Sequence, residues 1–128
     1  MGARVISSPM RLAADVLFGL VAVVHAWFLV LERFLWEKPL GLKTFRQTRE
    51  EARLTATLAK NQGLYNGFLA AGIVWALASG AAGRSACLFF ASCVVVAGLY
   101  GAWSTGKRAI LLLQALPAAL ALGLLLLA

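Results

Sequence analysis

The sequence predicts an all-α membrane protein, a bundle of four transmembrane helices with a long amphipathic cytoplasmic loop between the first and second helices. Hydrophobic residues make up 62% of the 128 residues and charged residues 13%, whereas soluble domains are about half apolar and a quarter charged. The few charges after Arg53 separate uncharged runs of 20 to 23 residues. A helix of that length crosses about 30 Å of hydrocarbon.

The first helix is predicted over residues 12–35. Its uncharged run lies between Asp15 and Glu32, and apolar residues extend it at both ends. A transmembrane helix is favoured over a cleaved signal peptide, because Asp15 stands at the front of the apolar run and apolar residues continue past Ala26. The three later uncharged runs predict the remaining helices at residues 63–79, 85–102 and 109–127. We expect the whole chain, residues 1–128, to form a single integral membrane domain.

The loop between the first two predicted helices is long and basic. Pro39-Leu40-Gly41 marks the end of the first helix, and residues 44–59 contain neither Gly nor Pro. Acidic and basic side chains in this stretch have the spacing of pairs on a helix. The pattern predicts either a helix lying on the membrane surface or a cytoplasmic extension of the second helix.

Basic residues predict the orientation. The loop between the first and second helices holds seven Lys and Arg residues and the loop between the third and fourth holds two, whereas the opposite side holds Arg4, Arg11 and Arg84. The positive-inside rule places both loops in the cytoplasm and both termini outside, as expected for a bacterial inner membrane protein. The net charge of +7 then reflects basic residues beside an anionic lipid bilayer, and no nucleic-acid partner is expected.

Two further patterns concern packing. Cys87 and Cys93 lie six residues apart on the third helix and cannot bridge each other within it; with one histidine in the chain, no metal site is predicted. Small residues recur at Gly63, Gly67 and Ala71, and at Ala97 and Gly101. Such spacing lets helix backbones approach closely. Packing within the chain is favoured, and a homo-oligomer through these faces remains open.

Polar residues of all four predicted helices lie in the cytoplasmic half. His25 and Glu32 are seven residues apart and share one side of the first helix. Polar groups in lipid are costly and face the protein interior or a wet cavity. The predicted cavity is lined by His25, Glu32, Asn61, Gln62, Tyr65, Asn66, Tyr100 and Gln114.

Several motifs resemble those of the domain-of-unknown-function 1304 family, small integral membrane proteins of bacteria and some fungi. They are Val24-His25, the run from Leu31 to Trp36 and the run from Asn61 to Ala70, with weaker matches near residues 97–101 and 114–117. The resemblance implies that the characteristic motif comprises His25, Glu32, Trp36, Asn61, Gln62, Tyr65 and Asn66. Some members carry the label "epimerase", and the resemblance leaves the activity open.

The favoured function is acid–base isomerase chemistry on a lipophilic small molecule. His25 and Glu32 are the candidate catalytic residues, because an imidazole and a carboxyl group can move protons between them. Asn61, Asn66 and Tyr65 can hold a developing oxyanion. The full set of candidate substrate-binding residues is Asn61, Gln62, Tyr65, Asn66, Tyr100, Gln114 and Trp36.

Three alternatives stay open. His25 can serve as the axial ligand of a haem b, held non-covalently because the chain has no CxxCH motif. A small-molecule transporter or ligand-binding membrane protein also fits a four-helix chain with one intramembrane Glu, although the basic loop disfavours a route for cations. Finally, the polar residues can serve packing alone, with Glu32 paired to Lys107 or Arg108 and the asparagines joining helices. The sequence identifies neither substrate nor cofactor.

Overall fold

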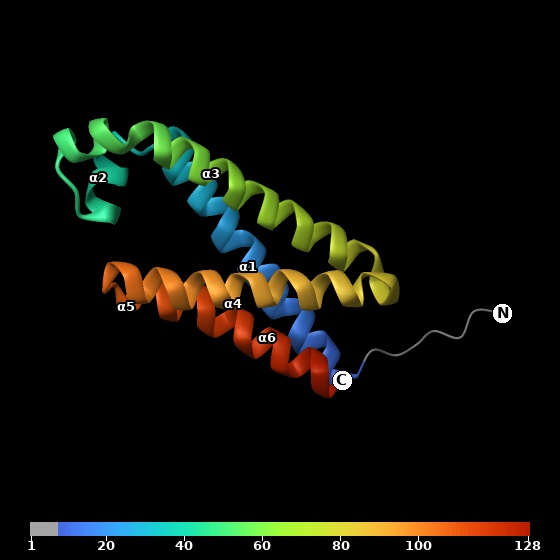
Figure 1. Cartoon of the computed structure of the whole chain (residues 1–128). Coiled ribbons are helices and arrows are strands. Elements are labelled where there is room, and N and C mark those ends of the chain that lie inside the picture. The colour runs from blue at the N-terminus through green and yellow to red at the C-terminus, as the bar shows by residue number, and fades with distance from the viewer. Residues whose placement is uncertain (1–7) are drawn as a thin grey trace. The chain divides into compact units, whose positions relative to one another are not determined.

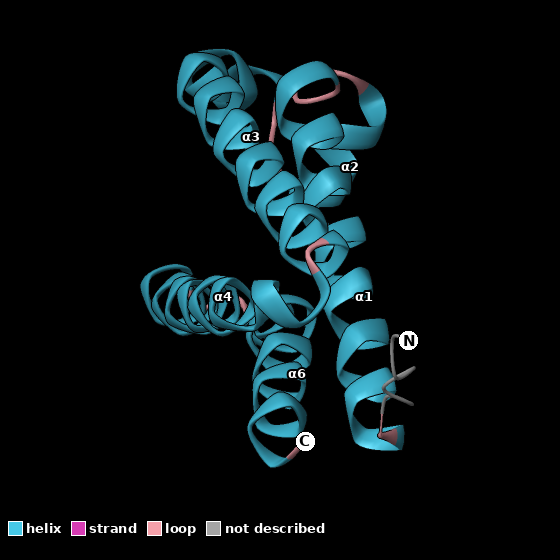
Figure 2. Ribbon diagram, turned by 90° about the vertical axis from the view of Figure 1, so that its right-hand side faces the viewer, coloured by secondary structure: helices cyan, strands magenta, loops and turns pink. Residues whose placement is uncertain are grey.

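The computed structural model describes residues 8–128, and their regular secondary structure is entirely helical (Figure 2). Arg4, which enters the orientation argument, lies outside these residues. Chain order is shown in Figure 1, from α1 (Pro9–Phe34) through α2 (Pro39–Phe45) and α3 (Arg49–Ala78) to α4 (Arg84–Thr105). A 3₁₀ turn, η1 (Gly80–Gly83), precedes α4. The last helix consists of α5 (Arg108–Ile110), the π-helical turn η2 (Leu111–Ala115) and α6 (Leu116–Leu127). The all-α prediction is confirmed.

The described residues form five helices, so the prediction of a four-helix bundle is wrong in its count. The segment predicted as a loop forms α2 and the first half of α3. Pro39 starts α2, where its missing N–H costs nothing, and Arg46 ends it in the left-handed conformation at φ 51°. Of the two predictions for this segment, extension of the second helix is confirmed, because α3 runs unbroken from Arg49 to Ala78.

The first turn of α3 is capped by a reciprocal pair of side chains. The Thr48 backbone N–H and hydroxyl donate to Glu51 Oε2 at 2.7 and 3.0 Å, and the Glu51 backbone N–H donates to Thr48 Oγ1 at 3.2 Å. This capping box satisfies donors that a helix N-terminus otherwise leaves unpaired. It explains why the helix begins well before residue 63, where the apolar run starts.

Three helices are long and apolar enough to cross a membrane: Pro9–Phe34, Gly80–Thr105 (which joins η1 to α4) and Arg108–Leu127. The span predicted over residues 63–79 is not among them. In α3, the apolar stretch begins with three amide side chains, those of Asn61, Gln62 and Asn66. These amides lower the mean hydropathy of the stretch.

The chain divides into two compact units. The first comprises residues up to Val21 together with Gly72–Ala128, and the second comprises Ala22–Ala71. Both α1 and α3 contribute residues to each unit, so this division does not test the prediction of a single integral membrane domain.

The first unit is packed by apolar and small side chains. Its fully buried residues include Phe18, Ile73, Val94 and Leu125. Helix α4 passes so close to η2 that a Cβ on Gly98 would lie 2.7 Å from the Ala115 backbone nitrogen. In η2 the Leu116 N–H donates to the Leu111 carbonyl oxygen, five residues back.

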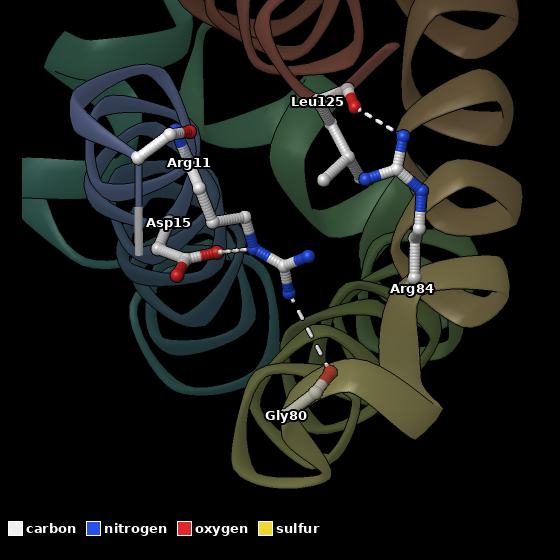
Figure 3. Close-up of polar contacts among 6 residues, drawn as sticks. Arg11, Asp15, Gly80, Arg84 and Leu125 are labelled. Carbon is white, nitrogen blue, oxygen red and sulfur yellow. Dashed lines mark hydrogen bonds and ion pairs between the residues drawn. The ribbon is translucent and has the colours of Figure 1, made fainter. Parts of the chain in front are cut away.

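In the first unit, two arginine side chains donate hydrogen bonds to backbone carbonyl oxygens near the ends of other helices (Figure 3). Arg11 Nε lies 3.1 Å from Asp15 Oδ1 on the next turn of α1, and Arg11 Nη2 donates to the Gly80 carbonyl oxygen at 3.5 Å. Arg84 Nη2, at the start of α4, donates to the Leu125 carbonyl oxygen at 2.6 Å. That carbonyl lies in the last turn of α6, where helical partners are missing.

Candidate functional site

In the second unit, a buried hydrogen bond joins α1 to α3. Asn66 Nδ2 donates to Glu32 Oε2 at 3.0 Å, and the two residues are 4% and 9% exposed. Gly63 makes the contact possible, because a Cβ there would lie 3.0 Å from both Glu32 Cβ and the Arg33 backbone nitrogen. One turn later, Gly67 faces Leu29 at the same distance. Small residues thus bring the helices together where a carboxyl group and an amide can meet.

A groove of about 490 Å³ opens beside this hydrogen bond, within the second unit. Its walls come from the end of α1, from α2 and from α3. The lining residues are Glu32, Trp36, Phe45, Thr55, Leu58, Ala59, Asn61, Gln62 and Tyr65. Five of the predicted site residues line it: Glu32, Trp36, Asn61, Gln62 and Tyr65. Asn66 does not line the groove but donates a hydrogen bond to Glu32, which does.

Trp36 is held in place by three contacts. Its indole Nε1 donates to the Ala52 carbonyl oxygen at 3.1 Å and to Thr55 Oγ1 at 3.2 Å, both on α3. Its ring packs against Phe45 of α2, with the ring centroids 4.7 Å apart. Since its single polar atom is satisfied on α3, Trp36 presents an apolar face to the groove.

Glu32 supplies the charge of the groove lining. Its Oε2 accepts a hydrogen bond from Asn66, and among the residues of the second unit Glu32 forms no ion pair and its Oε1 has no hydrogen-bond partner. The described residues contain no fully enclosed side-chain oxygen or nitrogen without a partner, so Oε1 is not fully enclosed, and Glu32 lines the groove. Lys107 and Arg108, the predicted partners of Glu32, belong to the first unit, so that pairing stays a prediction. Within the second unit, the prediction that an asparagine joins two helices is confirmed.

The other three predicted site residues lie elsewhere. His25 is fully buried on α1 and meets the edge of Phe28, with ring centroids 6.2 Å apart, but it does not line the groove. Tyr100 and Gln114 belong to the first unit. Tyr100 is 64% exposed and lines an apolar groove along α4, and Gln114 lies in the π-helical turn η2.

Sequence reasoning missed four groove residues, namely Phe45, Thr55, Leu58 and Ala59. All four fall in the stretch predicted as a loop. A signal for the α3 residues was nevertheless present, because Thr55, Leu58, Gln62 and Tyr65 follow a spacing of three, four and three residues on one side of a helix. Extension of the second helix, one of the two predictions for this stretch, aligns them.

Between residues 8 and 128, no group of three or more His, Cys, Asp or Glu side chains is placed to hold a metal ion. Cys87 and Cys93 are both free thiols, in agreement with the prediction that they do not bridge each other.

Comparison with known proteins places the chain in a family. A family model described as "Protein of unknown function (DUF1304)" matches residues 19–126. The chain belongs to the DUF1304 family. It is also 30% identical over 104 residues to the uncharacterized protein YpaA of Lactococcus lactis subsp. lactis (strain IL1403), a match covering 80% of this chain and 87% of YpaA. No solved structure matches it. The part of this DUF1304 protein that matches the model contains every groove residue.

Proposed function

We propose that the groove is an acid–base site that isomerises a lipophilic small molecule, with Glu32 as the group that moves the proton. One observation carries this proposal. Glu32 lines the groove, Asn66 binds one of its carboxylate oxygens, and the other oxygen has no hydrogen-bond partner within the second unit. A general base needs an oriented carboxylate with a free lone pair within reach of the substrate.

The proton transfer requires no co-reactant. Glu32 Oε1 takes a proton from a carbon next to a carbonyl group, and the carbonyl becomes an enolate. The proton on the carboxyl group exchanges with water, and the same group then returns a proton, either to the other face of that carbon or to the far end of a conjugated system. Atoms and electrons balance, since the product is an isomer of the substrate.

Polar groups at the rim complement the developing oxyanion. Asn61, Gln62 and Tyr65 line the groove and carry amide or hydroxyl donors. Trp36 and Phe45 provide apolar walls for the rest of the substrate. The proposal assigns no step to His25, because this side chain does not line the groove.

We also propose how the helices and the groove are oriented in the membrane. The three apolar helices support integration into a bilayer, and we propose that the apolar end of α3 crosses with them. The excess of Lys and Arg around α2 and the first half of α3 favours the cytoplasmic side for the groove and the outer side for both termini.

The test uses purified protein in lipid nanodiscs and a panel of lipophilic ketones in D₂O. Deuterium incorporation is followed by mass spectrometry, and cholest-5-en-3-one is included because its conjugated isomer absorbs in the ultraviolet. Glu32→Gln should lower exchange at least about 100-fold. Glu37→Gln, a change to an exposed carboxyl group outside the groove, is the matched control and should leave exchange unchanged. Full activity in Glu32→Gln, or no exchange above background in the unmodified protein, overturns the proposal.

A ligand-binding or transport role is the second candidate. It is favoured by the openness of the groove, whose lining residues Leu58 and Tyr65 are 71% and 62% exposed. An enzyme gains from excluding water from its reacting groups, whereas a carrier needs ready exchange. Proton-coupled uptake into proteoliposomes that is lost in Glu32→Gln, without deuterium exchange, would favour this candidate.

A further inference from the structure

An exposed apolar stripe runs along the part of α3 that belongs to the second unit. Leu54, Leu58, Tyr65 and Phe68 are spaced by four, seven and three residues, so they share one face of the helix. Their exposed fractions are 73%, 71%, 62% and 58%. Asn61, which is also exposed, lies on this face between Leu58 and Tyr65. Large apolar side chains exposed along one face mark contact with lipid or a partner.

Basic side chains occupy a different face of the same helix. Arg49, Arg53 and Lys60 are exposed and spaced by four and seven residues. Adjacent residues of a helix point about 100° apart, so the mean direction of this row lies about a third of a turn from the mean direction of the apolar stripe, and the two approach each other most closely at Arg53 and Phe68. Where α3 enters the bilayer, this division turns its basic face towards head groups and water and its apolar face towards acyl chains.

The groove adjoins the apolar face. Leu58 and Tyr65 belong to both the stripe and the groove lining, whereas Arg49, Arg53 and Lys60 do not line the groove. A molecule dissolved in lipid beside the stripe therefore meets the groove without crossing the basic face. In the groove it meets the carboxylate of Glu32, which accepts hydrogen bonds and cannot donate them when ionised.

We propose that the substrate is an amphiphile that enters the groove sideways from the membrane, with a head group that carries both the reacting carbonyl and a hydrogen-bond donor next to Glu32, and with an apolar chain along Leu58 and Tyr65. This inference rests on the proposed function, because it names the substrate class of the same site. The volume of about 490 Å³ is that of a pocket for a small organic molecule.

The first experiment locates the mouth of the groove. Trp27, Trp75 and Trp103 are exposed and are replaced by Phe, which leaves Trp36 as the single tryptophan. In phosphatidylcholine vesicles, doxyl-labelled lipids should quench Trp36 strongly and aqueous acrylamide weakly. Strong quenching by acrylamide with none by doxyl lipid would show that the groove opens to water, and would overturn the proposal.

The second experiment tests the head group with a matched pair of probes. Bromine quenches tryptophan on contact, so 11-bromo-1-undecanol and 1-bromoundecane report binding near Trp36 and differ by one hydroxyl donor. The alcohol should quench Trp36 saturably, with at least a tenfold lower half-saturation than the bromoalkane. Equal quenching by the two probes, or quenching that never saturates, contradicts a donor site at Glu32.

Substitutions on α3 test the route. Leu58→Lys places a charge at the mouth and should abolish saturable quenching by the alcohol, and Leu58→Asn repeats the test with a neutral side chain. Leu64→Lys is the control, because Leu64 is exposed on α3 but lies outside the stripe and the groove. Equal quenching in all three variants overturns the route. If probe binding fails but deuterium exchange persists, this inference falls and the proposed function stands. If the alcohol binds saturably but no deuterium exchange occurs, the proposed function falls and the groove still binds the amphiphile.

Discussion

Two glycine contacts, one in each unit, show what close approach between helices does and does not provide. In the first unit Gly98 lets α4 touch the backbone of Ala115, and the surrounding buried residues, such as Val94 and Ala118, are apolar. In the second unit Gly63 lets α3 touch α1 beside Glu32, and Asn66 stands within one turn. Both contacts depend on a missing side chain. The second brings two polar groups together, and the groove lies there.

The largest expected effect on stability concerns Gly98. In Gly98→Ala the new Cβ would lie 2.7 Å from a backbone nitrogen, which cannot move without displacing the helix. We expect a loss of about 2–3 kcal/mol in the free energy of unfolding, measured by denaturation in detergent micelles. Gly123→Ala is the control, because nothing lies within 4 Å of its Cβ position, and it should gain about 0.5–1 kcal/mol. Equal behaviour of the two variants would refute the close contact.

Removal of Asn66 tests the polar contact of the second unit. Asn66→Ala leaves Glu32 Oε2 without its donor in a buried position, and we expect a loss of about 1–2 kcal/mol in the same denaturation assay. Asn61→Ala removes an exposed amide and should change stability by less than about 0.5 kcal/mol. If Asn66→Ala lowers stability but leaves deuterium exchange untouched, the hydrogen bond serves packing alone.

A smaller effect of opposite sign is expected at Arg46. This residue ends α2 in the left-handed conformation, at φ 51° and ψ 50°, which costs a residue with a Cβ about 1–2 kcal/mol. Arg46→Gly relieves that strain and frees the unfolded chain somewhat, so the expected net gain is about 0.5–1 kcal/mol. Lys43→Gly, inside α2, should instead cost about 1 kcal/mol. A loss of stability in Arg46→Gly would contradict the assigned backbone conformation.

The smallest effect is a pH dependence at the start of α3. Hydrogen bonds from the Thr48 backbone N–H and hydroxyl hold the pKa of Glu51 below its ordinary value. The folded state therefore binds the proton less readily than the unfolded state, and the contribution of this cap is complete above the ordinary pKa and is lost as the pH falls through the lowered one. The melting temperature should fall less in Glu51→Gln than in the unmodified protein between neutral and acidic pH. A parallel fall in both would remove Glu51 as the source.

The sequence predicted the helical class because apolar runs of helix length need no tertiary information. It also placed Glu32, Asn61, Gln62 and Tyr65 near one another, because polar side chains in apolar surroundings seek the same place. It could not show that Asn66 binds Glu32 while Asn61 faces the groove, since that depends on how α3 rotates against α1 at Gly63. It missed Leu58 because two arrangements were open for residues 44–59, and only the extension of the second helix aligns Leu58 with Gln62. It missed Phe45 because that residue reaches the groove through the packing of α2 on Trp36.

The π-helical turn η2 has a consequence for comparing relatives by alignment. A turn closed by a bond from Leu116 to Leu111 holds one residue more than an α-helical turn. Deleting one residue from this turn would restore an α-helical turn and leave the residues on either side on nearly the same faces, because five residues of a π-turn and four residues of an α-helix both complete little more than one turn. Arg108 and Ile110 would then keep their present neighbours. A one-residue gap at this place in an alignment would therefore mark the loss of the π-turn without a change of helix face.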